Sequence, residues 1–90
     1  MAGIRLRCFD LSAVGVYFHT DLLLNPGERV QLRMRIPYRY RPIHVVGEVV
    51  RVETGKRGIA PGMGIAFREI AETDSTALKQ FLSRRFLSNG

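Results

Sequence analysis

Three residues near the N-terminus have the types and spacing to bind a polar ligand. Asp10, Ser12 and Gly15 form the pattern D-x-S-x-x-G between two apolar runs. Asp and Ser side chains bond nearby backbone amides in turns, and glycine tolerates positive φ or the close approach of another group. The same residues present a carboxylate, a hydroxyl and an uncrowded backbone on one small ledge. Two interpretations follow: a turn that only shapes the chain, or a site for a hydrogen-bonding ligand.

The residues that could carry catalysis or hold a metal do not form clusters in the sequence. His19 and His44 stand alone, and Cys8 is the only cysteine. Metal sites and nucleophilic sites need several such residues together. The segment Gly62-Met63-Gly64 precedes a predicted strand rather than a helix, so it does not match a phosphate-binding glycine loop. We therefore predict no enzymatic activity, no metal and no cofactor.

The composition indicates one small basic domain. Ninety residues with 46% hydrophobic content fit a single domain over residues 1–90. The 14 Lys and Arg residues against 8 Asp and Glu residues give a net charge of +6, and only Lys56 and Lys79 are lysines. Arginine binds phosphates and guanine edges with two parallel donors, so this balance favours partners that carry phosphate. The alternative is a solubilising surface with scattered ion pairs.

The sequence also predicts a compartment and an assembly state. A single cysteine, Cys8, permits no disulfide within the chain, which favours a reducing compartment. No apolar run approaches the ~18 residues needed to cross a bilayer, and residues 1–5 lack the apolar core of a secretory signal. We expect a cytoplasmic protein without membrane insertion that is a monomer or a weak homodimer.

Five strands and one helix are predicted to position these residues. Alternating apolar and polar residues, with β-branched and aromatic types enriched, predict the strands, and an apolar stripe at helical spacing predicts the helix. The run 43–53 is apolar on both parities, so we expect a central strand covered on both faces. The predicted fold is mainly β, a small antiparallel β-barrel with one C-terminal α-helix at its open end. The strand runs are 4–9, 14–20, 29–36, 43–53 and 63–69, and the helix covers 74–87.

Four blocks of sequence, in this order, resemble the PilZ domain family. They are D-x-S-x-x-G at 10–15, N-P-G-E-R-V-Q-L-R-M-R-I-P at 25–37, G-E-V-V-R-V at 47–52 and P-G-M-G-I-A-F at 61–67, the last followed by the amphipathic helix. The similarity covers nearly the whole chain. It implies an antiparallel barrel of the split-barrel type with a C-terminal helix. It also implies a bacterial signalling module, because many PilZ domains are cyclic di-GMP receptors that control motility, biofilm formation, adhesion or virulence.

The resemblance also implies which residues bind the ligand. In the family the Asp and Ser of the motif hydrogen-bond cyclic di-GMP and the Gly keeps the ledge open, which assigns Asp10, Ser12 and Gly15. Ligand-binding members also carry an R-x-x-x-R pair upstream, whose arginines stack on guanines and clamp phosphates. Residues 1–9 contain no R-x-x-x-R, so either this segment is absent or the polypeptide begins after it. Arg5 and Arg7, spaced by two on one strand face, are the remaining candidates to contact the ligand.

Three functions are compatible with the sequence. The first is a cyclic di-GMP receptor that acts through a protein partner, and the second is a ligand-independent PilZ-like adaptor in which D-x-S-x-x-G only shapes a turn. The third is a nucleic-acid-binding β-barrel, suggested by the net charge, by the arginines at 29, 33 and 35 and by the loop Tyr38-Arg39-Tyr40-Arg41. The family resemblance favours a solvated strand face and a hairpin loop over nucleic-acid binding.

Overall fold

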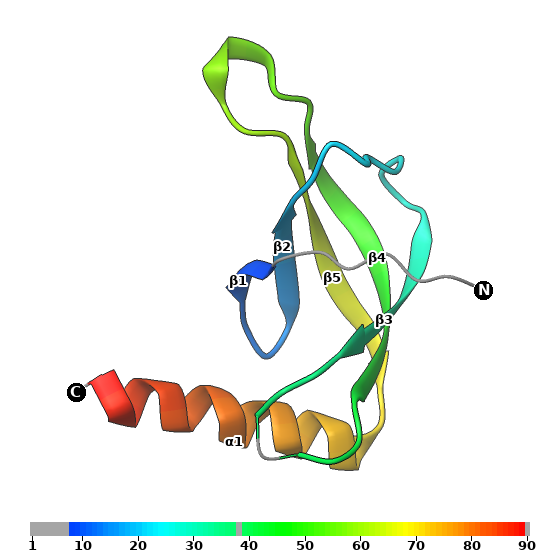
Figure 1. The fold of residues 1–90 in the computed structure, drawn as a ribbon. Helices are drawn as coiled ribbons and strands as arrows, with labels where there is room; N and C mark the ends of the chain where they lie inside the picture. The colour runs from blue at the N-terminus through cyan, green and yellow to red at the C-terminus, as the bar shows by residue number, and fades with distance from the viewer. Residues whose placement is uncertain (1–7, 38, 90) are drawn as a thin grey trace.

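Five antiparallel strands and one long helix make up the fold (Figure 1). The computed structural model describes residues 8–37 and 39–89. The prediction of a mainly β fold with a single C-terminal helix is confirmed for this part of the chain. The elements are β1 (Cys8–Leu11), β2 (Gly15–His19), β3 (Arg29–Met34), β4 (Ile43–Glu53), the short 3-10 helix η1 (Lys56–Gly58), β5 (Gly62–Ile70) and α1 (Glu72–Asn89).

The first predicted strand differs from the observed one. Residues 4–7 lie outside the described residues, and the described strand runs from Cys8 to Leu11. Asp10 and Leu11 therefore belong to a strand, where a turn was predicted. The reason is that the backbone of Asp10 pairs with that of Tyr17. The other elements start and end within two residues of their predicted limits.

The strands form one antiparallel sheet in the order β1-β2-β5-β4-β3. Within the described residues β1 and β3 do not pair with each other, so hydrogen bonds do not close the predicted barrel. The sheet is instead strongly twisted (Figure 1), and its two edges share one interior. Leu11 from β1 and Leu32 from β3 pack against the same buried clusters. Side-chain packing thus brings the two edge strands together, whereas hydrogen bonds between strands do so in a closed barrel.

The core lies on one face of the sheet and continues under α1. The first cluster is formed by side chains from β2, β4 and β5, namely Val16, Phe18, Val49, Met63 and Ile65. The second joins Ile43 and Val45 of β4 to Leu78 of α1. In Figure 1, α1 lies across the end of the sheet opposite the β4–β5 hairpin. The helix therefore covers the open end of the sheet, as its apolar stripe predicted.

Strand β4, which lies between β5 and β3, is covered on its inner face only. Val49 is fully buried, whereas Val50 is 51% exposed and Arg51 is exposed. The prediction that both faces of residues 43–53 are covered is therefore wrong. The cause is a β-bulge: Val49 pairs with Ile65 and Arg51 pairs with Gly64, so two residues of β4 advance against one of β5. A bulge reverses the alternation of a strand beyond it. Val49 therefore faces the core, whereas the next two residues, Val50 and Arg51, both face outward.

Candidate ligand site

Ser12 closes the β1–β2 hairpin through its hydroxyl group. Its Oγ accepts the backbone N–H groups of Val14 and Gly15, both at 3.2 Å, and donates to the Gly15 carbonyl at 3.3 Å. The same carbonyl accepts the backbone N–H of Ser12 at 2.9 Å. The predicted local turn chemistry is therefore observed at Ser12. Because the Gly15 carbonyl has a second donor, the hydroxyl proton can turn to a ligand oxygen without leaving that carbonyl unpaired.

Gly15 is required by the close approach of the neighbouring strand. It pairs with Ala66, and a Cβ added at position 15 would lie 2.7 Å from the backbone oxygen of Ile65. Its φ is not among the positive values, which in the described residues occur at Gly27, Gly55, Arg57 and Gly58. Packing against β5, rather than turn geometry, therefore explains the glycine of the motif.

Asp10 has no such structural task. Its side chain is exposed and makes no hydrogen bond or ion pair with any described residue. Cys8 pairs with Phe18 and Asp10 pairs with Tyr17, so β1 carries a bulge of one residue. Without this bulge, the alternation of β1 would turn Asp10 toward the core. The fold therefore presents the carboxylate of Asp10 on the outer face of the sheet.

The other two predicted contacts, Arg5 and Arg7, lie outside the described residues. Sequence reasoning missed a different pair, Tyr17 and Arg51. The Cζ atom of Arg51 lies 5.4 Å from the centroid of the Tyr17 ring, within cation–π range. Both residues pair with Gly64, which lies between them and carries no side chain. Strict alternation would place Arg51 on the face of Val49, so no sequence pattern pointed to this contact.

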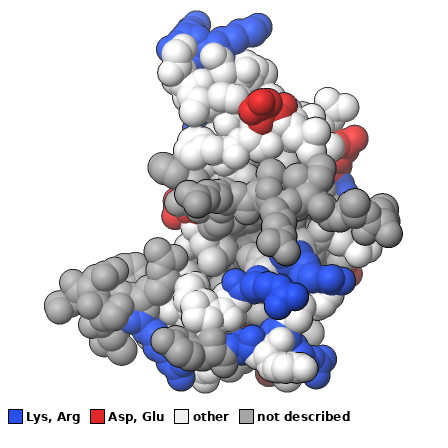
Figure 2. All heavy atoms as spheres, in the orientation of Figure 1, with Lys and Arg blue, Asp and Glu red and all other residues white. Residues whose placement is uncertain are grey.

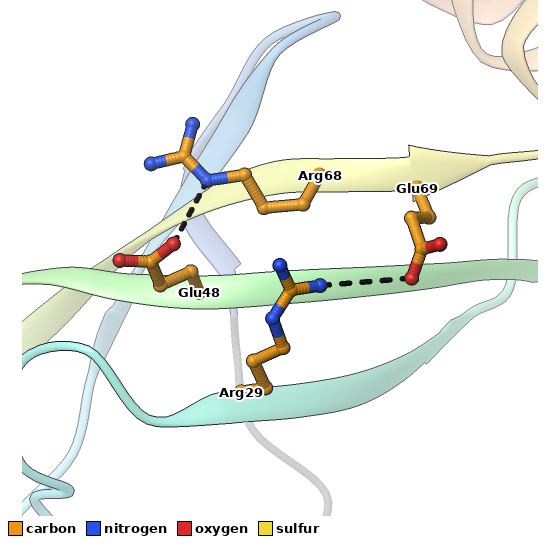
Figure 3. Close-up of polar contacts among 4 residues, drawn as sticks. All are labelled: Arg29, Glu48, Arg68 and Glu69. Carbon is orange, nitrogen blue, oxygen red and sulfur yellow. Dashed lines mark hydrogen bonds and ion pairs between the residues drawn. The ribbon is translucent and has the colours of Figure 1, made fainter.

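The arginines of the outer face are partly neutralised by acidic neighbours. Arg29 Nη1 lies 3.6 Å from Glu69 Oε2, and Arg68 Nε donates to Glu48 Oε1 at 3.1 Å (Figure 3). These exposed pairs add little stability, but they break up the basic surface. Figure 2 shows acidic side chains between the basic tip of the β4–β5 hairpin and the basic lower half of the molecule. The described basic side chains therefore do not form a continuous track in this view.

The segment between β3 and β4 is held to the helix through Asp74. Arg39 Nη2 donates to Asp74 Oδ1 at 2.8 Å, and the backbone N–H of His44 donates to Asp74 Oδ2 at 3.2 Å. Tyr38 lies outside the described residues, and Tyr40 is 98% exposed. Arg39 is thus paired with Asp74, whereas Tyr40 and Arg41 are exposed in the described part of this loop.

Replacing Asp74 by asparagine is expected to cost about 1 to 3 kcal/mol of stability near neutral pH, because it removes a charged hydrogen bond to the half-buried Arg39. Arg39, followed by the His44 backbone, holds the pKa of Asp74 below its ordinary value of 3.8, while burial acts the other way. The folded state therefore disfavours protonation of Asp74. Its contribution is present above pH 3.8 and is lost as the pH falls through the lowered pKa.

The measurement is urea unfolding of the wild type and Asp74→Asn across a pH series. The difference between their unfolding free energies should shrink as the pH falls below the ordinary pKa of Asp74. Glu72→Gln, an exposed neighbour in the first turn of α1, is the matched control and should change stability little. A difference that stays constant down to about pH 3 would show that the charge of Asp74 does not stabilise the fold.

Two other features of the described residues bear on possible sites. A shallow hollow of about 330 Å³ lies among β3, β4, the end of β5 and the start of α1, with Gln31, His44 and Asp74 in its wall. It includes none of the motif residues. In residues 8–37 and 39–89, no three His, Cys, Asp or Glu side chains come together to hold a metal ion, and no helix is long and apolar enough to cross a membrane.

Comparison with known proteins finds a matching family model and a similar solved structure. The model of the PilZ domain family matches residues 2–84. The structure of the inhibitor of motility MotI/DgrA from Bacillus subtilis is similar with a TM-score of 0.83 and 27% sequence identity. That match covers 97% of this chain and 44% of the other, so this chain spans less than half the length of that protein. No curated protein matches significantly.

Proposed function

Since this chain belongs to the PilZ domain family, we propose that it is a regulatory module that binds cyclic di-GMP and acts through a protein partner. PilZ domains are binding modules rather than enzymes. The similarity to an inhibitor of motility supports control of motility as the process. Biofilm control is a second process compatible with the family. We place this activity in the bacterial cytoplasm, in keeping with the single cysteine.

The state of Asp10 carries this proposal. Ser12 and Gly15 have tasks in the hairpin, so their presence is explained without a ligand. Asp10 is exposed, has no partner among the described residues, and is turned outward by a bulge. A carboxylate accepts two hydrogen bonds side by side, and the ring N–H and exocyclic amine of guanine donate two in that geometry. The carboxylate of Asp10 is thus suited to bind a guanine edge, and no contact with a described residue requires an acidic side chain at this position.

The remaining motif residues assist this contact. The hydroxyl proton of Ser12 turns from the Gly15 carbonyl to a ligand oxygen, because that carbonyl keeps the N–H of Ser12 as a donor. Gly15 assists indirectly in this proposal, because its missing side chain lets β5 pack against the hairpin that presents Asp10 and Ser12. Arg5 and Arg7, immediately before β1, supply positive charge for the phosphates in this proposal.

Calorimetric titration of cyclic di-GMP at low salt tests the proposal. The wild type should bind, and Asp10→Ala should raise the Kd by about 100-fold or more, equivalent to ~2.8 kcal/mol. Its Tm should stay within a few degrees of wild type, since Asp10 has no partner in the described part of the fold. Arg33→Ala, an exposed change on the outer face of β3, is the control and should keep the wild-type Kd. Absence of heat at high micromolar ligand would refute the proposal.

A ligand-independent adaptor is the second candidate. The observation in its favour is that hydrogen bonding and packing already account for Ser12 and Gly15. In that case the exposed face binds a protein partner whatever the nucleotide level. An Asp10→Ala protein that still restores motility control in a deletion strain, and that captures the same partner with and without cyclic di-GMP, would support the adaptor over the receptor.

A further inference from the structure

Two β-bulges turn Asp10 and Arg51 toward the same face of the sheet. The bulge in β1 places Asp10 opposite Tyr17, and the bulge in β4 places Arg51 opposite Gly64. Gly64 also pairs with Tyr17, so Asp10, Tyr17, Gly64 and Arg51 form one continuous row across four strands. We name this set the outer-face row. Without the bulges, both charged residues would point to the core side.

The ring of Tyr17 passes over two glycines of β5. A Cβ added at Gly62 would lie 2.8 Å from Cε1 of Tyr17, and one added at Gly64 would lie 3.6 Å from its Cδ2. The ring is therefore supported from below by two glycines of β5. His19 meets it edge to face, with ring centroids 5.5 Å apart and planes at 84°. These contacts fix the ring as a partly exposed flat surface beside Asp10.

Arg51 reaches this surface from the opposite side. Its Cζ lies 5.4 Å from the Tyr17 centroid, and its guanidinium makes no ion pair with any described residue. Asp10 and Arg51 are both exposed, so the charge of each is solvated by water and needs no ion pair with the other. Across the sheet, the outer-face row therefore presents a hydrogen-bond acceptor at Asp10, an aromatic surface at Tyr17 and paired hydrogen-bond donors at Arg51, in that order.

From this arrangement we infer that Tyr17 and Arg51 complete the ligand site, with a guanine base stacked on Tyr17 between Asp10 and Arg51. The inference rests on the proposed cyclic di-GMP function and adds residues to its site. Asp10 accepts from the ring N–H and amine of the base, and Arg51 donates to its O6 and N7 atoms. Stacking on the aromatic ring supplies the remaining contact area.

The same geometry predicts selectivity between purines. Adenine has an amine where guanine has O6, so it would turn a donor toward the donors of Arg51. Adenine also presents an unprotonated ring nitrogen to the carboxylate of Asp10, where guanine presents an N–H. Both mismatches leave a polar group without a partner, so cyclic di-AMP should bind at least about tenfold more weakly than cyclic di-GMP.

Titrations of both dinucleotides into variants of the outer-face row test the inference. Arg51→Gln should raise the Kd for cyclic di-GMP by about 10- to 100-fold, and Arg51→Lys should not restore it, because an ammonium lacks the planar fork. Tyr17→Leu should raise the Kd about tenfold or more, whereas Tyr17→Phe, which keeps the ring, should stay within about threefold of wild type. Arg33→Gln is the matched control for loss of an exposed arginine.

The outcomes separate this inference from the function on which it rests. If the wild type binds and Asp10→Ala loses binding, while Arg51→Gln and Tyr17→Leu bind as the wild type does, the base platform is wrong and the receptor function stands. If the wild type binds neither dinucleotide, both fail. Should Tyr17→Leu unfold, Arg51→Gln decides alone, since Arg51 is exposed and its replacement should leave Tm unchanged.

Discussion

Gly15→Ala is expected to destabilise the domain by about 2 to 3 kcal/mol, with a fall in Tm of about 10 to 20 °C. The added Cβ would lie 2.7 Å from the backbone oxygen of Ile65. That oxygen belongs to β5 in the middle of the sheet, so it cannot move away without opening the pairing of β2 with β5. A clash with a side chain can be relieved by rotation of that side chain, whereas this clash can be relieved only by a shift of the β5 backbone.

Thermal and urea unfolding measure this effect, and Gly64→Ala is the matched control. Gly64 is a buried glycine in β5, but its added Cβ would find the nearest atoms at 3.4 and 3.6 Å, which is ordinary contact. Gly64→Ala should therefore change the unfolding free energy by less than about 1 kcal/mol. If Gly15→Ala proves as stable as Gly64→Ala, then β5 does not approach the motif as closely as the structure shows.

This prediction changes how mutations in D-x-S-x-x-G should be interpreted. A Gly15→Ala protein that fails to bind cyclic di-GMP would show only that the hairpin is damaged. Ser12 has a similar ambiguity, because its hydroxyl accepts two backbone N–H groups of the turn. Asp10 alone separates binding from folding, since no described residue depends on its carboxylate. Evidence for or against a ligand should therefore rest on Asp10 and on the exposed Arg51.

The elements of the fold could be predicted because they follow simple periodicities. In β3, Val30, Leu32 and Met34 alternate with exposed residues, and this alternation predicts a strand with one apolar face. Glu72 and Asp74 lie in the first turn of α1, where acidic residues favour a helix start, and the spacing of Leu78 and Leu82 predicts its apolar stripe. These patterns depend on local geometry and on one buried face, and both are visible in the sequence.

The site could be predicted only in part, because bulges leave no periodic signal. The run Val49-Val50-Arg51 looks like a strand buried on both faces, but the bulge exposes Val50 and turns Arg51 outward. Asp10 likewise looked like a turn residue, although it pairs with Tyr17 in β1. The motif itself was found by its residue types. Its neighbours in space come from β2 and β4, and only the strand register brings them together.

Leu78→Ala is expected to have the largest effect on stability, about 2 to 5 kcal/mol. Leu78 is 1% exposed and packs in the cluster that joins α1 to Ile43 and Val45 of β4. Leu11 of β1 and Met34 of β3 border the same cluster. Because β1 and β3 share no hydrogen bonds in the described residues, packing against this cluster helps to hold the two sheet edges near each other. A cavity here should loosen both edges as well as the helix.

Urea unfolding and amide hydrogen exchange distinguish this role from ordinary core packing. Leu78→Ala should lower protection in α1 and also in β1 and β3, while the exposed neighbour change Lys79→Ala should leave protection and stability close to wild type. The outer-face row lies on the opposite face of the sheet, so affinity for cyclic di-GMP, measured where the variant is still folded, should stay within about threefold of wild type. Loss of protection in α1 alone would mean that the sheet keeps its twist without the helix. In that case the strands themselves hold the two edges of the sheet together, and α1 only shields the core from solvent.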